Sequence, residues 1–162
     1  MILDEGYLNV EDEHRQTLID ESSIQFKDFE FEKLIGEGSF GKVYKAYKKD
    51  DAHVYAMKVM GKQELINQDQ IKDAVGEATT MRILDHPYIL KLEHSFQTPT
   101  NLYMALELCP NGDLSDILDE HTLLDEEIAK FLTAELILAM KYLHNKGVIF
   151  RDLKPKNILL DS

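Results

Sequence analysis

The sequence contains a single cysteine, Cys109, and no long hydrophobic run. One cysteine cannot form a disulfide within the chain, which suits a reducing compartment. A membrane-spanning helix would need about 20 consecutive apolar residues, and a secretory signal would need a charged start followed by an apolar stretch. Since neither pattern occurs, we expect a cytoplasmic protein that does not span a membrane.

Basic residues are also fewer than acidic ones. The chain has 18 Lys and Arg but 30 Asp and Glu, which gives a formal net charge of −12 at pH 7. This charge would repel the phosphates of nucleic acids and of anionic lipid surfaces. We therefore expect neither a nucleic acid nor a membrane among the partners. The six histidines are scattered along the chain, so no metal-binding pattern is visible.

A glycine-rich segment is the first positive signal. The sequence Gly36-Glu-Gly-Ser-Phe-Gly-Lys-Val43 has glycines at positions 36, 38 and 41, and glycine lets backbone N–H groups approach phosphate oxygens. A dinucleotide-binding turn would lead into a helix, whereas residues 42–48 favour a strand, so we predict a hairpin. A Walker A loop would need a Ser or Thr hydroxyl where Val43 stands, which excludes that motif.

Residues 54–60 alternate as a strand does, with Ala56, Lys58 and Met60 on one face. A buried ammonium between apolar neighbours needs an anion, because an unpaired buried charge is costly. Alternatively, Lys58 extends its amine into solvent, which is the commoner arrangement for a strand lysine.

Residues 70–84 have helical spacing, with Glu77 inside an apolar stripe. The Glu77 carboxylate needs a cation unless it turns toward water, and Lys58 is the candidate. Gly76 lowers the stability of this helix by about 1 kcal/mol relative to Ala, so we predict a loosely held helix. The stripe consists of Ile71, Ala74, Ala78 and Met81.

Residues 150–157 read Phe-Arg-Asp-Leu-Lys-Pro-Lys-Asn. Asp152 offers a carboxylate that can orient a hydroxyl, Lys154 offers an ammonium for phosphate, and Asn157 offers an amide oxygen for a metal ion. This combination predicts a phosphotransfer loop.

The glycine hairpin, the strand lysine, the helix glutamate and this loop resemble, in order and spacing, the signature of eukaryotic protein kinases. The resemblance runs from about Phe29 to Asp161. Lys154-Pro155 is similar to serine/threonine kinases, and the residues around the glycine loop, with an aromatic before Arg151, are similar to the AGC group.

The resemblance implies an α+β, two-lobe fold. Residues 1–28 would form a mobile acidic extension, and residues 29–108 a complete small lobe with an antiparallel sheet and one long helix. Residues 109–162 would hold the hinge exit and only the first part of the helical large lobe.

The resemblance also implies ATP and Mg²⁺ as cofactors and a protein Ser or Thr as substrate. Asp152 would accept the hydrogen bond of the substrate hydroxyl, Lys154 would steady the γ-phosphate, and Asn157 would bind one Mg²⁺. Lys58, paired with Glu77, would hold the α- and β-phosphates.

The other residues implied to bind ATP fall into four groups. The glycine loop would cover the triphosphate, apolar side chains would enclose the adenine, the hinge backbone would bond its edge, and one acid would reach the ribose. They are Gly36, Glu37, Gly38, Ser39, Phe40 and Gly41; Val43, Ala56, Leu159 and the gatekeeper Leu106; Glu107 and Cys109; and Asp113.

The 162 residues contain no Asp-Phe-Gly motif, which in this family supplies the second metal ligand. The resemblance therefore implies an incomplete catalytic domain, weakly active or inactive alone, with a partner covering the truncated large lobe. Two alternatives stay open. One is a pseudokinase-like nucleotide-binding or interaction module, and the other is a different phosphotransferase, such as a small-molecule kinase.

Patterns elsewhere predict the remaining elements. We expect strands at residues 89–96 and 102–107, a short helix ending at Leu118, a long helix over residues 125–144 that Gly147 ends, and a buried strand at residues 158–160. The apolar stripe of the long helix would comprise Ile128, Phe131, Leu132, Leu136, Met140 and Leu143.

Overall fold

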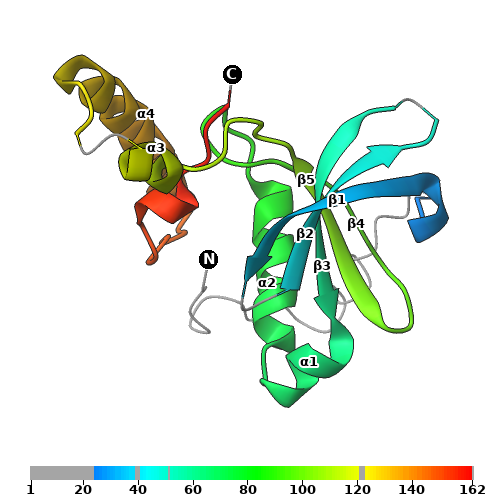
Figure 1. Ribbon diagram of the computed structural model, residues 1–162. Coiled ribbons are helices and arrows are strands. Elements are labelled where there is room, and N and C mark those ends of the chain that lie inside the picture. Colours follow the sequence, from blue (N-terminus) through cyan, green and yellow to red (C-terminus); the bar gives the residue numbers. More distant parts are fainter. Residues whose placement is uncertain (1–23, 39–40, 51, 121–122, 162) are drawn as a thin grey trace. The chain divides into compact units, whose positions relative to one another are not determined.

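The computed structural model describes residues 24–38, 41–50, 52–120 and 123–161 (Figure 1). The predicted extension at residues 1–28 therefore lies mostly outside the described residues, as do Ser39 and Phe40 of the glycine loop. In the described part, no helix is long and apolar enough to cross a membrane.

Five strands and four α-helices make up the described chain, with short 3-10 turns before the first strand and near the end. In chain order the elements are η3 (Phe26–Asp28), β1 (Phe29–Gly38), β2 (Gly41–Lys48), β3 (Val54–Gly61), α1 (Lys62–Asn67), α2 (Ile71–Ile83), β4 (Leu92–Gln97), β5 (Asn101–Glu107), α3 (Leu114–Glu120), α4 (Glu126–Asn145) and η4 (Pro155–Asn157).

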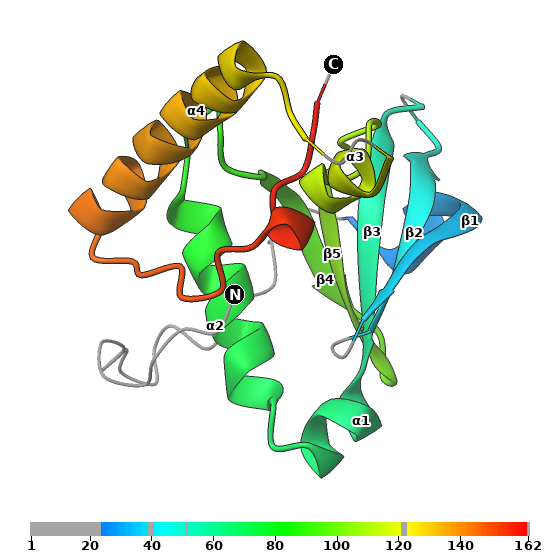
Figure 2. The same cartoon turned by 60° about the vertical axis from the view of Figure 1, so that its left-hand side comes forward.

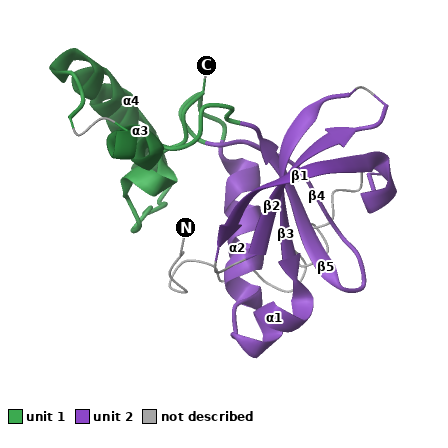
Figure 3. Cartoon of the chain, viewed as in Figure 1, with its two compact units in different colours: residues 1–3, 85–89, 109–162 green, residues 4–84, 90–108 purple. Residues whose placement is uncertain are grey.

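The described chain divides into two compact units (Figure 3). One unit contains the sheet, α1 and α2, and it comprises the described residues up to Leu84 together with Leu90–Leu108. The other contains α3, α4 and the segment that follows, and it comprises Asp85–Ile89 together with the chain from Cys109 onward.

The sheet has the strand order β1-β2-β3-β5-β4, and every neighbouring pair is antiparallel. This arrangement confirms the predicted antiparallel sheet of the small lobe. The side chains of β3 and β5 alternate between the two faces of the sheet, so the sheet has an apolar cluster on each face. Tyr55, Met57, Tyr103 and Ala105 belong to one cluster, which Phe29 and Phe96 complete with stacked rings.

The opposite cluster joins the sheet to the helices, and α2 runs alongside the sheet (Figure 2). Met60 and Met104 are almost fully buried in it, together with Ala74 and Ala78 of α2. The small alanines let the helix backbone come close to the sheet. Ile71, which we expected in the buried stripe, is instead 42% exposed, because it lies at the first turn of α2.

In the second unit, α4 confirms the predicted long helix. The Asp125 carboxylate accepts a hydrogen bond of 2.9 Å from the Glu127 N–H and so caps the helix. Gly147 follows the helix end with φ = 73°, a conformation that favours glycine. The apolar stripe is only partly covered, since Leu143 is buried while Ile128 and Phe131 are 53% and 63% exposed.

Two sequence predictions are wrong. β4 begins at Leu92 rather than residue 89, because the Ile89 N–H donates to the His86 carbonyl in a turn. Residues 158–160 form no buried strand. They make only an isolated bridge between Leu159 and Asp113, with backbone hydrogen bonds to residues 111–114, and Leu159 is 45% exposed.

Candidate functional site

The side chains of Lys58 and Glu77 form an ion pair within the sheet unit. The Lys58 ammonium donates to both carboxylate oxygens of Glu77, at 2.9 and 2.8 Å. The two side chains are 16% and 17% exposed, so solvent screens the pair less than a surface pair. The predicted partnership is confirmed, and the alternative of a lysine extended into water is wrong.

The position of Lys58 follows from the register of the sheet. Lys58 lies in the central strand β3, opposite Val43 of β2 on one side and Met104 of β5 on the other. Ala56 is two residues away on the same face and opposite Leu106. The strand that carries Lys58 is thus held between two hydrogen-bonded neighbours, and Glu77 of α2 supplies a counter-charge.

The glycine segment forms a hairpin, as predicted. Gly36 pairs with Val43, Glu37 with Lys42 and Gly38 with Gly41, between β1 and β2. The Lys42 ammonium lies 3.7 Å from the Glu37 carboxylate at the exposed edge. A strand follows the loop where a dinucleotide-binding fold would have a helix, which excludes that fold.

The loop after α4 brings two polar side chains, those of Lys154 and Asn157, to Asp152. The Lys154 ammonium lies 2.7 Å from the Asp152 carboxylate. The Asn157 amide nitrogen donates to the carbonyl and the carboxylate of the same residue, at 2.8 and 2.9 Å. The hydrogen bond from Lys154, helped by the one from Asn157, lowers the pKa of the Asp152 carboxyl below its ordinary value.

These hydrogen bonds determine which atom of Asn157 can still bind a cation. The Asn157 nitrogen is committed to Asp152, so the amide oxygen remains to bind a cation, which fits the hard oxygen ligands that Mg²⁺ prefers. Among the described residues, no cluster of three or more His, Cys, Asp or Glu side chains could hold a metal ion. The amide oxygen alone would therefore be a weak site, completed by phosphate oxygens.

Asp113 stands at the beginning of α3. Its Oδ1 accepts hydrogen bonds from the Ser115 N–H at 2.8 Å, from the Ser115 hydroxyl, and from the Asp116 N–H at 3.3 Å. The Ser115 hydroxyl is the largest cause of a lowered pKa for Asp113. We predicted a ribose contact for Asp113, and one carboxylate oxygen is already used within its own turn.

The remaining predicted residues have contrasting environments. Leu106 is buried in the cluster beneath α2. Glu107 ends β5, and its N–H donates to the Lys91 carbonyl at 3.0 Å. Cys109, the single cysteine of the sequence, is partly buried. Lys154, predicted to hold the γ-phosphate, binds Asp152 in this structure.

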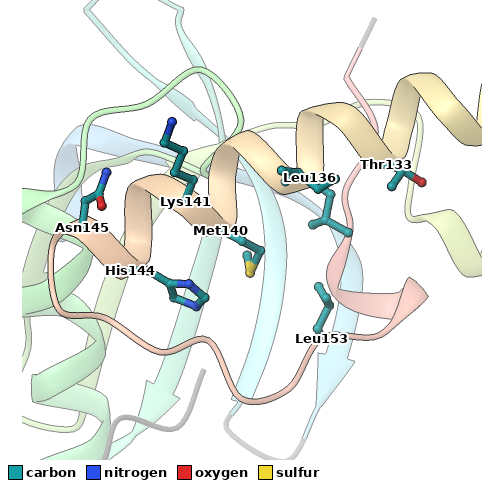
Figure 4. A pocket seen from close by; sticks show the side chains of 8 residues that line it. Thr133, Leu136, Met140, Lys141, His144, Asn145 and Leu153 are labelled. Carbon is teal, nitrogen blue, oxygen red and sulfur yellow. The ribbon is translucent and has the colours of Figure 1, made fainter.

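A hollow of about 430 Å³ lies along α4 (Figure 4). Leu136 and Met140 line it from the helix, and Leu153 faces them from the loop. It contains none of the predicted site residues, so we assign it no part in phosphotransfer.

A family model for the protein kinase domain matches residues 29–162 of the chain. The chain belongs to the protein kinase family. Its five-stranded antiparallel sheet with helices is consistent with the small lobe of that fold.

Several curated relatives are serine/threonine-protein kinases of AGC type. The chain is 41% identical over 138 residues to AtPK2/AtPK19 of Arabidopsis thaliana, 42% over 139 residues to SCH9 of Saccharomyces cerevisiae, and 41% over 136 residues to tricornered of Drosophila melanogaster. These alignments cover 85%, 84% and 84% of this kinase chain, respectively, but only 29%, 17% and 29% of the relatives. The chain thus spans less than a third of their length.

The sequence analysis missed Ser115, whose hydroxyl and N–H both hold Asp113. An Asp followed two residues later by Ser at the beginning of a helix is a recognisable capping pattern. That pattern could have identified Ser115 from the sequence.

Proposed function

We propose that this chain carries the catalytic machinery of an ATP-dependent protein serine/threonine kinase. The partly buried Lys58–Glu77 ion pair, held beside a glycine hairpin, is the observation that supports this proposal most strongly. A lysine fixed by a carboxylate holds its ammonium in a defined position, as phosphate binding requires. The names of the relatives support protein Ser and Thr as acceptors.

In the proposed assignment, residues 29–108 form the small lobe and residues 109–162 the hinge exit and first part of the large lobe. The glycine hairpin and Lys58 bind the triphosphate, while Leu106, Val43 and Ala56 contact the adenine. Asn157 would hold Mg²⁺, which when bound offsets phosphate charge.

Asp152 then orients the acceptor. The Ser or Thr oxygen bonds to the γ-phosphorus as the bond from that phosphorus to the bridging oxygen breaks, and ADP leaves with the electron pair. The hydroxyl proton passes to the Asp152 carboxylate and from there to solvent. Because the pKa of Asp152 is lowered, this carboxylate stays ionised and accepts the hydroxyl hydrogen bond, but it is a weak base. It therefore acts mainly by orientation.

We further propose that the 162 residues alone transfer phosphate weakly or not at all. The sequence contains no Asp-Phe-Gly motif, and a single amide oxygen is a poor Mg²⁺ site. A nucleotide-binding module without phosphotransfer is the alternative function.

Nucleotide binding is tested by titrating the chain with ATP and Mg²⁺ and comparing wild type with Lys58→Met. The variant should bind at least about tenfold more weakly, since a charge-assisted hydrogen bond contributes about 1.5–3 kcal/mol. Lys62→Met is the matched control, because Lys62 is a partly exposed lysine directly after β3 that donates to Gln97. Equal affinities for all three proteins would contradict the assignment of Lys58.

Phosphotransfer is tested with γ-labelled ATP and a generic protein substrate. We expect trace transfer by the 162-residue chain, and none by Asp152→Ala. Robust transfer would contradict the proposed weak activity. ATP binding with no transfer above the Asp152→Ala background would favour the nucleotide-binding module.

A further inference from the structure

A polar contact between Arg82 and Ser95 joins α2 to β4 and lies outside the residues that the proposed chemistry uses. The Arg82 guanidinium donates a hydrogen bond to the Ser95 hydroxyl oxygen. Ser95 is buried, with an exposed fraction of 7%, and Arg82 lies in the last turn of α2. Hydrogen bonds from a charged donor are stronger than those between neutral groups, so this contact ties the C-terminal end of α2 to the sheet.

The register of the sheet relates this contact to the Lys58–Glu77 pair. Ser95 of β4 lies opposite Met104 of β5, and Met104 lies opposite Lys58 of β3. Directly opposite residues have their side chains on the same face, and Met104 belongs to the cluster that contacts α2. Ser95 and Lys58 therefore belong to one cross-strand row that faces the helix. They are about 10 Å apart, because neighbouring strands are about 4.8 Å apart.

Two side chains of α2 reach this row at separate points along the helix. Glu77 binds Lys58, and Arg82, five residues later in the sequence, binds Ser95. A rise of about 1.5 Å per residue puts Glu77 and Arg82 about 7.5 Å apart along the helix axis. A single attachment would leave the helix free to pivot about one point. Two attachments on different strands fix both its position along the sheet and its rotation.

The apolar packing of α2 does less to fix its position. The buried residues of α2 are Ala74, Ala78 and Thr80, and such small side chains bury little apolar area compared with Leu or Phe. A small slide or rotation of the helix therefore loses little packing energy. The polar contacts determine where Glu77 lies relative to Lys58 more than the apolar contacts do.

We propose that Arg82 and Ser95 are positioning residues, which hold α2 where the Glu77 carboxylate meets the Lys58 ammonium. Their effect on nucleotide binding rests on the proposed kinase function, because it requires Lys58 to bind phosphate. The charge of Arg82 has a second effect, since a cation in the last turn of a helix interacts favourably with the helix dipole. Replacing Ser95 separates the two effects, because the charge stays in place.

The test measures the coupling between Lys58 and Glu77 in different backgrounds. Urea denaturation gives the unfolding equilibrium constants of Lys58→Met, Glu77→Gln and the double variant, and their deviation from additivity is the coupling. The cycle is repeated with Ser95→Ala, and with Thr79→Val as the matched control. The Thr79 hydroxyl also donates a hydrogen bond, but to the Val75 carbonyl of the same helix.

We expect a coupling of about tenfold in the unfolding constant of the otherwise unchanged chain. Ser95→Ala should reduce it to about threefold or less, and Thr79→Val should leave it unchanged. Ser95→Thr, which keeps the hydroxyl, should restore it. Arg82→Met removes the same contact from the helix and should give the same reduction, which decides the matter if Ser95→Ala does not fold.

An undiminished coupling in Ser95→Ala or Arg82→Met would overturn the proposal. A contact that only stabilised the fold would lower the denaturation midpoint without changing the coupling.

ATP titrations on the same proteins separate this inference from the proposed function. If both hold, Ser95→Ala should weaken ATP binding by about threefold or more, whereas Thr79→Val should not. Loss of the coupling with unchanged ATP affinity would support the positioning contact and contradict the role of Lys58 in phosphate binding. A preserved coupling would contradict the positioning contact whatever the affinity for ATP.

Discussion

A side chain on Gly41 would collide with the backbone carbonyl oxygen of Val59, which lies in the neighbouring strand β3. The backbone of Gly41 also has φ = 131°, which residues with a Cβ rarely adopt. The glycine at this end of the hairpin is therefore required by strand packing, apart from any contact with phosphate.

Gly41→Ala should destabilise the chain by about 2 kcal/mol or more, because steric collision adds to backbone strain. Gly38→Ala is the control, since nothing lies within 4 Å of a Cβ at that position, and it should cost under about 1 kcal/mol. Urea denaturation followed by circular dichroism measures both. Equal losses would show that the collision is relieved by local movement.

Replacing Glu77 by Gln should destabilise the chain by about 1–3 kcal/mol, because Lys58 keeps its charge in a partly buried place without an anion. Adding Lys58→Met to Glu77→Gln should cost less than the sum of the two single changes. Glu127→Gln is the control, since Glu127 meets Lys130 on an exposed surface, and it should leave the denaturation midpoint unchanged. Additive losses at Lys58 and Glu77 would contradict a coupled pair.

Gly76→Ala should stabilise α2 by about 1 kcal/mol, because alanine favours the helix and a Cβ at position 76 meets nothing within 4 Å. The midpoint of urea denaturation should rise. A fall would mean that the helix needs flexibility, or more space than the structure shows, at this residue.

Ser115→Ala should raise the pKa of Asp113 toward the ordinary value of 3.8, because the Ser115 hydroxyl is the largest cause of the lowered pKa. An Asp whose folded pKa is depressed stabilises the fold above its unfolded pKa and loses that contribution as the pH falls through its folded pKa. The stabilisation by this cap should therefore begin to decline below about pH 4 in the wild type and be lost as the pH falls through the lowered pKa of Asp113. It should be smaller at neutral pH in the variant.

Carbon-13 NMR of the Asp113 carboxyl measures the pKa directly. Lys156→Met should raise it by a smaller amount, since Lys156 is the last of its causes. No change in either variant would show that neither group stabilises the ionised carboxylate.

Local patterns predicted the parts of the fold that depend on neighbours in sequence. The glycine hairpin followed from strand-forming residues on both sides of the loop, and the Lys58–Glu77 pair followed from two charges that each faced apolar neighbours. In both cases, few other arrangements of these residues would have a lower free energy.

Predictions that depended on a choice among distant partners were less successful. The backbone of residues 158–160 bonds to residues 111–114, a pairing that no periodicity indicates. Similarly, Asp152 binds Lys154 and Asp113 accepts hydrogen bonds from Ser115. The sequence identifies these polar groups, but their mutual contacts depend on the conformation of the turns that carry them.

Because β3 is a central strand, the backbone around Lys58 should resist local unfolding more than the backbone around Glu77. The backbone at Lys58 opens only if β3 loses its hydrogen bonds to β2 or β5, whereas Glu77 lies in α2 next to Gly76, which weakens the helix. Amide hydrogens near Glu77 should consequently exchange with deuterium sooner than those near Lys58. Local opening of α2 would then separate the two charges while the sheet stays intact.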